Sequence, residues 1–231
     1  MRPHVICHMG ASLDGRTLPE RWRPEGGQIP GLYDRLHAEL KGDAWLIGRV
    51  TGEEFAKGGS HPGDPGQVLP REPWIVRRDA PGYGIVLDTH GRIAWGRSDI
   101  GGDPIVVVLA QAAPDAHLAG LRADGVSYVF AGRQEIDLAL ALRVLARELR
   151  IRRLLLEGGG TINGAFLRAG LVDELSLILH PAVDGAQGAP CVFDSPGEHA
   201  SAAPIGSMTL QSCQVLEQGA VWLRYQIHGR P

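Results

Sequence analysis

Residues 153–180 read RLLLEGGGTINGAFLRAGLVDELSLILH: an apolar run, three glycines, a helical stretch and a second apolar run. The first run (153–157) predicts a buried strand, residues 161–169 predict a helix closed by Gly170, and residues 173–180 predict the next strand. A strand, a helix and a strand in this order form a crossover unit, which joins parallel strands. This stretch therefore predicts an α/β protein with a mostly parallel sheet.

The alternation of strands and helices continues on both sides of this stretch. Further apolar runs that predict strands lie at residues 4–9, 44–47, 74–77, 84–88, 105–109 and 126–130. Helices are predicted after Pro30, over residues 115–122, and after Asp137, a candidate N-cap followed by a leucine stripe. Residues 207–215 and 220–228 predict an antiparallel pair with its turn near residues 217–219.

Residues 57–73 are rich in Gly, Pro and His and predict a surface loop, since the alternation resumes after them. We therefore expect one domain over residues 1–231. Its fold class is α/β, with a mostly parallel central sheet flanked by helices and antiparallel C-terminal strands.

Composition narrows the classes of function. The net charge is -3 and no basic stripe is present, which argues against a nucleic-acid partner. No run reaches the ~18 apolar residues of a membrane span. The three cysteines, Cys7, Cys191 and Cys213, form no CxxC pair, which favours a reducing compartment and a cytoplasmic protein. The histidines show no metal-ligand spacing, and neither GxSxG nor GxxxxGK[ST] occurs.

The strongest candidate binding segment is Glu157-Gly158-Gly159-Gly160-Thr161, which joins a predicted strand to a predicted helix. Ligands of open parallel sheets bind beyond the carboxyl ends of the strands. Glycines let the backbone approach a ligand, and the amides at a helix N-terminus attract an anion such as a pyrophosphate. A tight turn without a ligand is the alternative.

A second strand is followed by Gly48, Arg49 and Thr51. An arginine holds phosphate through a fork of donors, so Arg49 would suit the 2′-phosphate of a dinucleotide. The alternative is a surface arginine beside a threonine that caps a helix.

Two more polar turns follow predicted strands. Ala11, Ser12 and Asp14 follow the first strand, and Thr89 follows the strand at 84–88. Either turn could line a ligand site, or could consist of ordinary turn residues that bind their own backbone.

Taken together, these segments resemble a known family. Residues 11–16 (ASLDGR) are similar to the opening signature of the reductase domain of riboflavin biosynthesis, the C-terminal half of the bifunctional pyrimidine deaminase/reductase. Residues 154–185 resemble that family's second signature, with its Glu-Gly-Gly turn and Val-Asp-Glu-Leu strand. Residues 48–51 also resemble the Gly-Arg-x-Thr segment of dihydrofolate reductase. The resemblance covers roughly residues 3 to 228.

The resemblance implies a dihydrofolate-reductase-like fold, NADPH as hydride donor and a homodimer. It places the residues from Gly158 to Thr161 along the cofactor pyrophosphate and Ala11 near the nicotinamide. It places Gly48, Arg49 and Thr51 on the adenine-side phosphates, with Thr89 nearby.

On the substrate side, the resemblance places Glu157 and Ser12 against the substrate, and Asp14 in the loop over the site. Of these, we expect catalytic roles for Glu157, which would position the substrate, and Asp14, the best candidate proton donor. Where the riboflavin enzymes carry a Gly-x-Ser-x-Trp-Ile segment, this chain has EGGQIP at residues 25–30. The residues that hold a substrate phosphate are therefore not predicted.

We expect an NADPH-dependent reductase of a small pyrimidine or related heterocycle. It would most resemble the enzyme that reduces the open-chain ribose carbonyl of 5-amino-6-(5-phosphoribosylamino)uracil to a ribityl group. One alternative is a dihydrofolate, pterin or other heterocycle reductase of the same fold. Another, from a different class, is a non-catalytic nucleotide-binding module.

Overall fold

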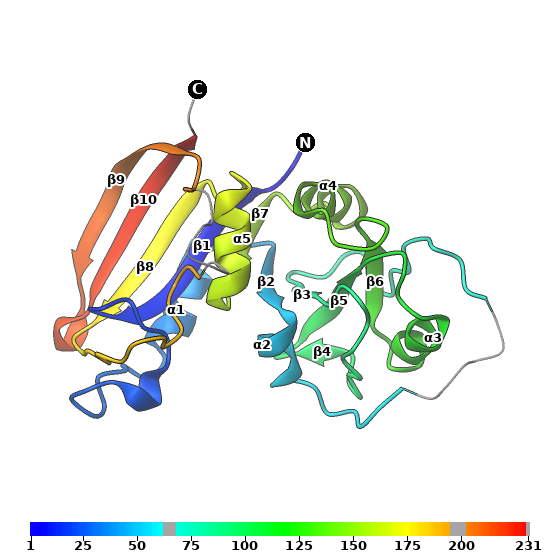
Figure 1. The fold of residues 1–231 in the computed structure, drawn as a ribbon, viewed down its shortest axis with the longest axis horizontal. Coiled ribbons are helices and arrows are strands. Elements are labelled where there is room, and N and C mark those ends of the chain that lie inside the picture. Colours follow the sequence, from blue (N-terminus) through cyan, green and yellow to red (C-terminus); the bar gives the residue numbers. More distant parts are fainter. Residues whose placement is uncertain (62–67, 195–201, 230–231) are drawn as a thin grey trace. The chain divides into compact units, whose positions relative to one another are not determined.

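The computed structural model describes residues 1–61, 68–194 and 202–229. The chain divides into two compact units (Figure 1). The first unit contains residues 1–3 and 43–154, and the second contains residues 4–42 and 155–231. The single domain over residues 1–231 stays a prediction.

The first unit is a parallel sheet. Its four parallel strands are β2 (Ala44–Gly48), β3 (Gly84–Leu87), β5 (Asp103–Leu109) and β6 (Ser127–Phe130), in the order β2-β3-β5-β6. A short strand, β4 (Asp99–Ile100), runs antiparallel to the start of β5. β3 and β6 are buried along their whole length, and β5 is buried after its first residue, as expected of parallel strands covered on both faces.

The described residues of this unit form the helices α2 (Arg49–Glu53), α3 (Asp115–Ala123) and α4 (Leu138–Leu149). α4 begins where the sequence predicts, because the Asp137 carboxylate accepts a hydrogen bond from the Leu140 amide at 2.8 Å. It buries Leu142, Leu145 and Leu149. The leucine stripe is thus buried, as predicted.

The second unit combines parallel and antiparallel strands. Its elements are β1 (His4–Ser12), η1 (Pro19–Arg21), α1 (Leu32–Leu40), α5 (Gly160–Arg168), β8 (Glu174–His180), β9 (Ile205–Val215), η2 (Glu217–Gly219) and β10 (Val221–Gly229). β7 (Arg153–Leu156) lies at the boundary between the units and precedes β1 in the strand order β7-β1-β8-β10-β9. β1 and β8 are parallel and end level with each other, Ser12 opposite His180. β10 is antiparallel to both β8 and β9.

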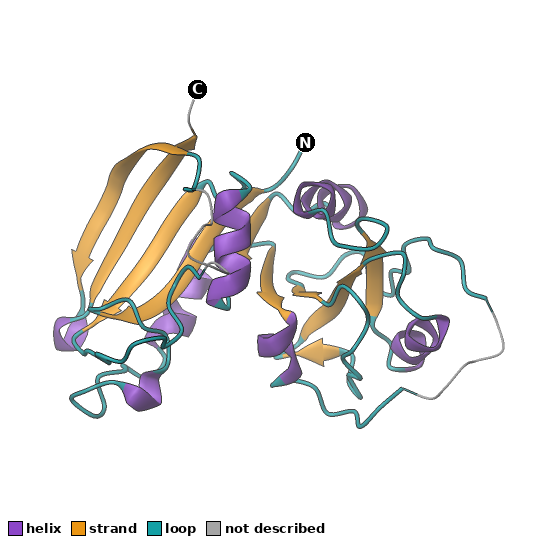
Figure 2. Cartoon of the chain, viewed as in Figure 1, coloured by secondary structure: helices purple, strands orange, loops and turns teal. Residues whose placement is uncertain are grey.

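The two faces of this second sheet differ in character. Figure 2 shows α5 in front of the sheet and α1 behind it. β8 alternates strictly, with Glu174, Ser176, Ile178 and His180 buried and its three leucines only half-buried. The inward face of β8 thus combines three polar side chains with Ile178, and its outward face is made of leucines.

The predicted fold class is confirmed, with corrections to single elements. The predicted strand at 74–77 is wrong. Within this stretch only Trp74 pairs, with Tyr128. The Val76 amide donates to the Ser127 side chain instead of to a backbone carbonyl. β1 continues past Gly10 to Ser12, because these residues pair in register with β8. The predicted loop at 57–73 has neither helix nor strand where it is described, and residues 62–67 lie outside the described residues.

Candidate active site

The turn after β7 carries the predicted glycine segment. Gly158 has a φ of 102°, the Gly158–Gly159 peptide bond is cis, and Gly159 is the N-cap of α5 with no side-chain cap. The first amides of a helix have no partner within the helix, and Gly159 and Thr161 are exposed beside them. This turn offers free N–H groups and the positive end of a helix dipole to an anion.

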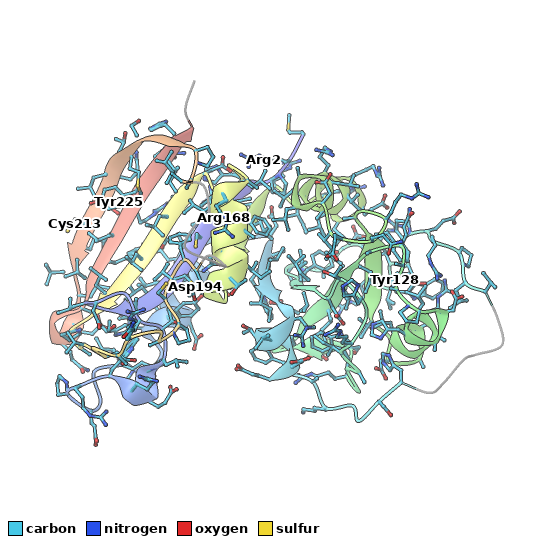
Figure 3. All side chains as sticks on the ribbon, in the orientation of Figure 1. Arg2, Tyr128, Arg168, Asp194, Cys213 and Tyr225 are labelled. Atoms are coloured by element: carbon cyan, nitrogen blue, oxygen red, sulfur yellow. The ribbon has the colours of Figure 1, made fainter. Side chains whose placement is uncertain are left out.

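Gly160 also has a packing role that the sequence does not reveal. A Cβ at this position would lie 2.2 Å from the Cys191 carbonyl oxygen and 2.8 Å from Asp194 Oδ2. Figure 3 shows Arg168 and Asp194 along α5, where an Arg168 Nη atom donates to the Asp194 carbonyl at 3.3 Å. Gly160 is therefore needed for the loop at 189–194 to approach α5.

Glu157, the last residue before the glycines, turns its carboxylate toward α1. Its Oε1 lies 2.7 Å from His37 Nδ1. The Glu157 side chain is 10% exposed and that of His37 is 32% exposed. Burial raises the pKa of Glu157 above its usual value, although the hydrogen bond and the charge of His37 oppose the shift.

Tyr33, which precedes His37 by four residues on α1, contacts β1. Its hydroxyl donates to the His8 carbonyl oxygen at 3.1 Å, and the Tyr33 and His8 rings lie 4.5 Å apart. Burial raises the pKa of Tyr33 well above its usual value, so the hydroxyl keeps its proton. Neither Tyr33 nor His37 was predicted from the sequence. Their signal was two polar aromatic residues four positions apart, each next to a leucine of the stripe that buries α1.

The His8 side chain is fully buried behind Tyr33. Its Nδ1 lies 3.0 Å from Ser176 Oγ, which also accepts a hydrogen bond from Trp222 Nε1 at 2.8 Å. Burial lowers the pKa of His8 to about 4, so its imidazole is neutral at pH 7. This polar chain fixes β1, β8 and β10 to one another beneath the candidate site.

The turn after β1 is closed by Asp14. Its carboxylate accepts hydrogen bonds from Ser12 Oγ at 2.5 Å and from the amides of Asp184 and Gly185 at 3.1 and 2.8 Å. The Ser12 hydrogen bond leads these in lowering the pKa of Asp14 to about 2. Asp14 is therefore ionised at neutral pH and holds two loops together, which disfavours it as a proton donor. Ala11 and Ser12 are fully buried.

His180 ends β8 opposite Ser12 and was not singled out from the sequence. It is buried, its ring lies 5.1 Å from that of Trp22, and its Nδ1 has no hydrogen-bond partner. Burial lowers its pKa. Only its position at a strand end could have marked it in the sequence.

The remaining predicted residues lie in the first unit. Gly48 is buried at the end of β2, and Arg49 forms an ion pair with Glu53 one turn along α2. Thr51 and Thr89 are half-buried, and the Thr89 carbonyl accepts the Ala110 amide at 2.9 Å. Of the predicted residues, the structure thus gathers Ala11, Ser12, Asp14 and Glu157–Thr161 in the second unit and the others in the first, and a cleft shared by both groups stays a prediction.

Within residues 1–61, 68–194 and 202–229, no group of three or more His, Cys, Asp or Glu side chains is placed to hold a metal ion. Among the same described residues, no helix combines the length and the apolar character that crossing a membrane requires.

Sequence comparison places the chain in a family. The profile of the RibD C-terminal domain matches residues 3–222. The chain belongs to the RibD C-terminal domain family. The resemblance read from the two signatures is thereby confirmed, and with it the prediction of an oxidoreductase of the riboflavin-pathway reductase type.

Similar proteins of known name agree with this family, and solved structures share the fold. A Methanothermobacter thermautotrophicus protein named 2,5-diamino-6-ribosylamino-4(3H)-pyrimidinone 5′-phosphate reductase is 32% identical, over 85% of this chain and 86% of the relative. An Aquifex aeolicus protein of the same name is 30% identical, over 85% and 84%. A pyrimidine reductase-like protein from Corynebacterium diphtheriae superposes with a TM-score of 0.70 at 18% identity, covering 98% of this chain and 92% of that one. The Saccharomyces cerevisiae reductase Rib7 gives 0.64 at 17% identity, covering 98% and 90%.

Proposed function

We propose that this protein is an NADPH-dependent reductase of a ribosylaminopyrimidine 5′-phosphate. The observation that carries the proposal is the segment Glu157–Thr161, which presents a buried carboxyl group to α1 and, directly after it, the free amides at the start of α5. One short segment can thus face a polar substrate and bind a cofactor phosphate. Two further findings support the same function: the chain belongs to the RibD C-terminal domain family, and the relatives that it matches are named as reductases.

The residues present fit NADPH, which when bound would supply the hydride. Exposed Gly159 and Thr161 flank the uncapped N-terminus of α5, where a pyrophosphate would be held by amides. Arg49 is accessible enough to leave Glu53 for a 2′-phosphate, because both side chains of that ion pair are partly exposed. Chain residues would bind and orient the cofactor, and the substrate carbon must then lie within ~3.5 Å of the hydride.

Cofactor binding is tested by titrating the protein with NADPH and following its fluorescence. We expect Thr161→Asp to weaken binding roughly tenfold, because the new carboxylate repels the pyrophosphate, and Thr161→Asn, a neutral variant of the same size, to bind as the unmodified protein does. Arg49→Gln should weaken the binding of NADPH more than the binding of NADH. Equal NADPH affinities of Thr161→Asp and Thr161→Asn would show that this turn does not bind the pyrophosphate.

The substrate is tested with a panel. The relatives' names specify the diaminopyrimidinone ribosyl phosphate, whereas the signatures resemble enzymes that act on the aminouracil ribosyl phosphate. Both compounds and dihydrofolate should be offered with NADPH, and oxidation followed by absorbance. Turnover of either ribosyl phosphate supports the proposal, turnover of dihydrofolate alone supports the alternative reductase, and binding without oxidation supports the nucleotide-binding module.

We also propose a homodimer formed through the leucine face, the apolar side of β8, β10 and β9. Paired residues on neighbouring strands share a face, and this face contains Leu175, Leu177, Leu179, Val221, Leu223, Met208, Leu210 and Val215. Leu210 is 50% exposed and Val215 79% exposed. A contiguous exposed apolar patch of this kind marks an interaction surface.

The dimer is tested by sedimentation of two matched variants. Leu210→Glu places a charge on the leucine face and should yield monomers. Gln214 lies on the same strand, paired with Trp222 on the opposite face, so Gln214→Glu should leave the mass unchanged. A monomeric mass for the unmodified protein rejects the dimer.

We also propose that the protein is cytoplasmic. Cys7, Cys191 and Cys213 are all free, and Cys7 is buried. Free thiols are typical of reducing compartments. Fractionation of the source cells, with an antibody against the protein, tests the location.

A further inference from the structure

Solvent reaches β1 near its carboxyl end, at Gly10. This residue is only half-buried, although β1 lies between β7 and β8 in the sheet. Its neighbours Met9 and Ala11, whose side chains point to the opposite face of the sheet, are buried. The opening at Gly10 therefore lies on the face that α1 covers.

Two side chains bound this opening. A Cβ at Gly10 would lie 3.5 Å from His180 Nε2 and 3.8 Å from Tyr33 Cδ2. Both distances are ordinary van der Waals contacts, so the space would accept a methyl group that the glycine does not supply. The space beside Gly10, between Tyr33 and His180, is called the Gly10 hollow below.

The Gly10 hollow lies among the carboxyl ends of parallel strands. His180 ends β8 level with the end of β1, and Glu157 directly follows β7, the other neighbour of β1. Tyr33 lies one helical turn before His37, whose Nδ1 contacts Glu157 Oε1. The hollow therefore lies close to the His37–Glu157 pair, at the edge of the sheet where ligands of parallel sheets bind.

The residues that bound the hollow are uncharged. The floor is the backbone of Gly10, one wall is the aromatic ring of Tyr33, and the other wall is the imidazole of His180. Burial lowers the pKa of His180, so this imidazole is neutral at pH 7. A largely apolar space with a few polar atoms suits a flat heterocycle, whereas a phosphate group is bound by cationic side chains or helix amides.

His180 is also a poor choice for stability alone. The side chains of His180 and Trp22 are both buried, and their rings lie 5.1 Å apart. Among the described residues, neither His180 Nδ1 nor Trp22 Nε1 has a hydrogen-bond partner. Buried polar atoms are nearly always hydrogen-bonded, and an unpaired one lowers stability. A ligand that the imidazole contacts explains why a histidine occupies this position.

We propose that the Gly10 hollow binds the pyrimidine ring of the substrate, with Gly10 as its floor and His180 against the edge of the ring. This inference rests on the proposed function and names the residues that select the ring. Gly10 determines specificity, because any side chain at this position occupies space that the ring needs. The ribosyl phosphate lies outside the hollow.

The first experiment uses Gly10→Ala and needs neither cofactor nor turnover. Binding is followed by NMR titration with two free rings, 5,6-diaminouracil and 2,5,6-triaminopyrimidin-4-one, and separately with ribose 5-phosphate. We expect a ring to bind the unmodified protein with a millimolar dissociation constant, as small fragments do. Gly10→Ala should weaken ring binding roughly tenfold or more, because one methyl group in a close-fitting pocket has an effect of this size. The affinity for ribose 5-phosphate should not change.

The fold should tolerate this substitution. The φ of Gly10 is not in the left-handed region, and its Cβ would meet only ordinary contacts. The urea unfolding midpoint of Gly10→Ala should therefore be unchanged or slightly higher, since alanine is favoured over glycine within a strand. Gly59→Ala, with open space around its Cβ, is the matched control and should bind the ring as the unmodified protein does.

The second experiment uses His180→Leu, which keeps the bulk of the side chain and removes its polar atoms. The variant should be at least as stable as the unmodified protein in urea, because it removes a buried nitrogen that has no partner, yet it should bind the ring more weakly. Normal ring binding by His180→Leu overturns the role of His180. A large loss of stability shows that the imidazole is structural and overturns that role as well.

The outcomes separate this inference from the proposed function. Unchanged ring affinity in Gly10→Ala, or failure of both rings to bind the unmodified protein, overturns the inference. Weaker binding of ribose 5-phosphate to Gly10→Ala, with ring binding unchanged, places the phosphate in the hollow and also overturns it. Absence of NADPH oxidation by the unmodified protein with either ribosyl phosphate removes the proposed function, yet the titrations still decide whether the Gly10 hollow binds a pyrimidine ring.

Discussion

A histidine pair in the first unit predicts that the free energy of unfolding falls by a definite amount at acid pH. His61 Nδ1 and His117 Nδ1 lie 3.0 Å apart, so only one of the two nitrogens can carry a proton. His61 Nε2 faces Asp124 Oδ2 at 3.2 Å, and His117 Nε2 lies 3.9 Å from Asp88 Oδ2. The His117 side chain is 6% exposed. Burial, with a smaller contribution from His61, lowers the pKa of His117 to about 4.

The magnitude follows from that shift. His117 titrates near 6.5 when unfolded and at about 4 when folded. Below pH 6.5 the unfolded chain binds a proton that the folded protein refuses, so the free energy of unfolding falls as the pH falls, and the loss ends near pH 4. At ~1.4 kcal/mol per pKa unit, the full loss is about 3 kcal/mol, of which about 2 kcal/mol occurs between pH 7 and pH 5.

The assay is urea unfolding at pH 7, 6 and 5 of the unmodified protein and of His117→Gln, which keeps a donor for His61 but does not titrate. The variant should lose about 2 kcal/mol less between pH 7 and 5. His90→Gln, at a histidine whose side chain is 48% exposed, should behave as the unmodified protein. His8 titrates equally in all three proteins and cancels. Parallel pH dependences for the unmodified protein and His117→Gln would refute the reasoning.

Three further predictions follow from close contacts. Asp14→Asn should lower the melting temperature but leave the pH–rate profile above pH 4 unchanged, because Asp14 has a pKa of about 2; an altered acid limb would contradict this. Gly160→Ala should cost roughly 1–3 kcal/mol in urea unfolding through overpacking, whereas Gly59→Ala, with open space around its Cβ, should be near neutral. Trp222→Phe should cost about 1 kcal/mol by removing the donor to Ser176, and an unchanged unfolding midpoint would show that this hydrogen bond adds nothing.

Most elements of the fold were predictable because their signals are local. α4 was marked by an aspartate cap and a leucine stripe, and β5 by a β-branched run. The error at 74–77 arose because pairing there is decided by Ser127, which is distant in sequence. β8 shows the same limit, since nothing local says that Ser176 and His180 are buried while the leucines face outward.

The candidate site was predictable in part, for the same reason. Glu157 and the glycines stand out because a strand, a turn and a helix are contiguous in sequence. His37 was missed because its partner, Glu157, is 120 residues away, and Tyr33 because its partner, the His8 carbonyl, is 25 residues away; only the packing of α1 brings these groups together. Asp14 was found, but its hydrogen bonds to the loop at 184–185, which give it a structural role, also come from a distant segment.

The two units differ in when they can form during synthesis. The first unit is almost one continuous stretch, residues 43–154, and can close as soon as that stretch has left the ribosome. β1 has to wait, since Ser176, the partner of His8, is made 168 residues later. A nascent chain whose first 154 residues have left the ribosome can thus hold a folded first unit and a first strand with no β8 to pair with. Folding of the second unit is then decided when the C-terminal strands are made.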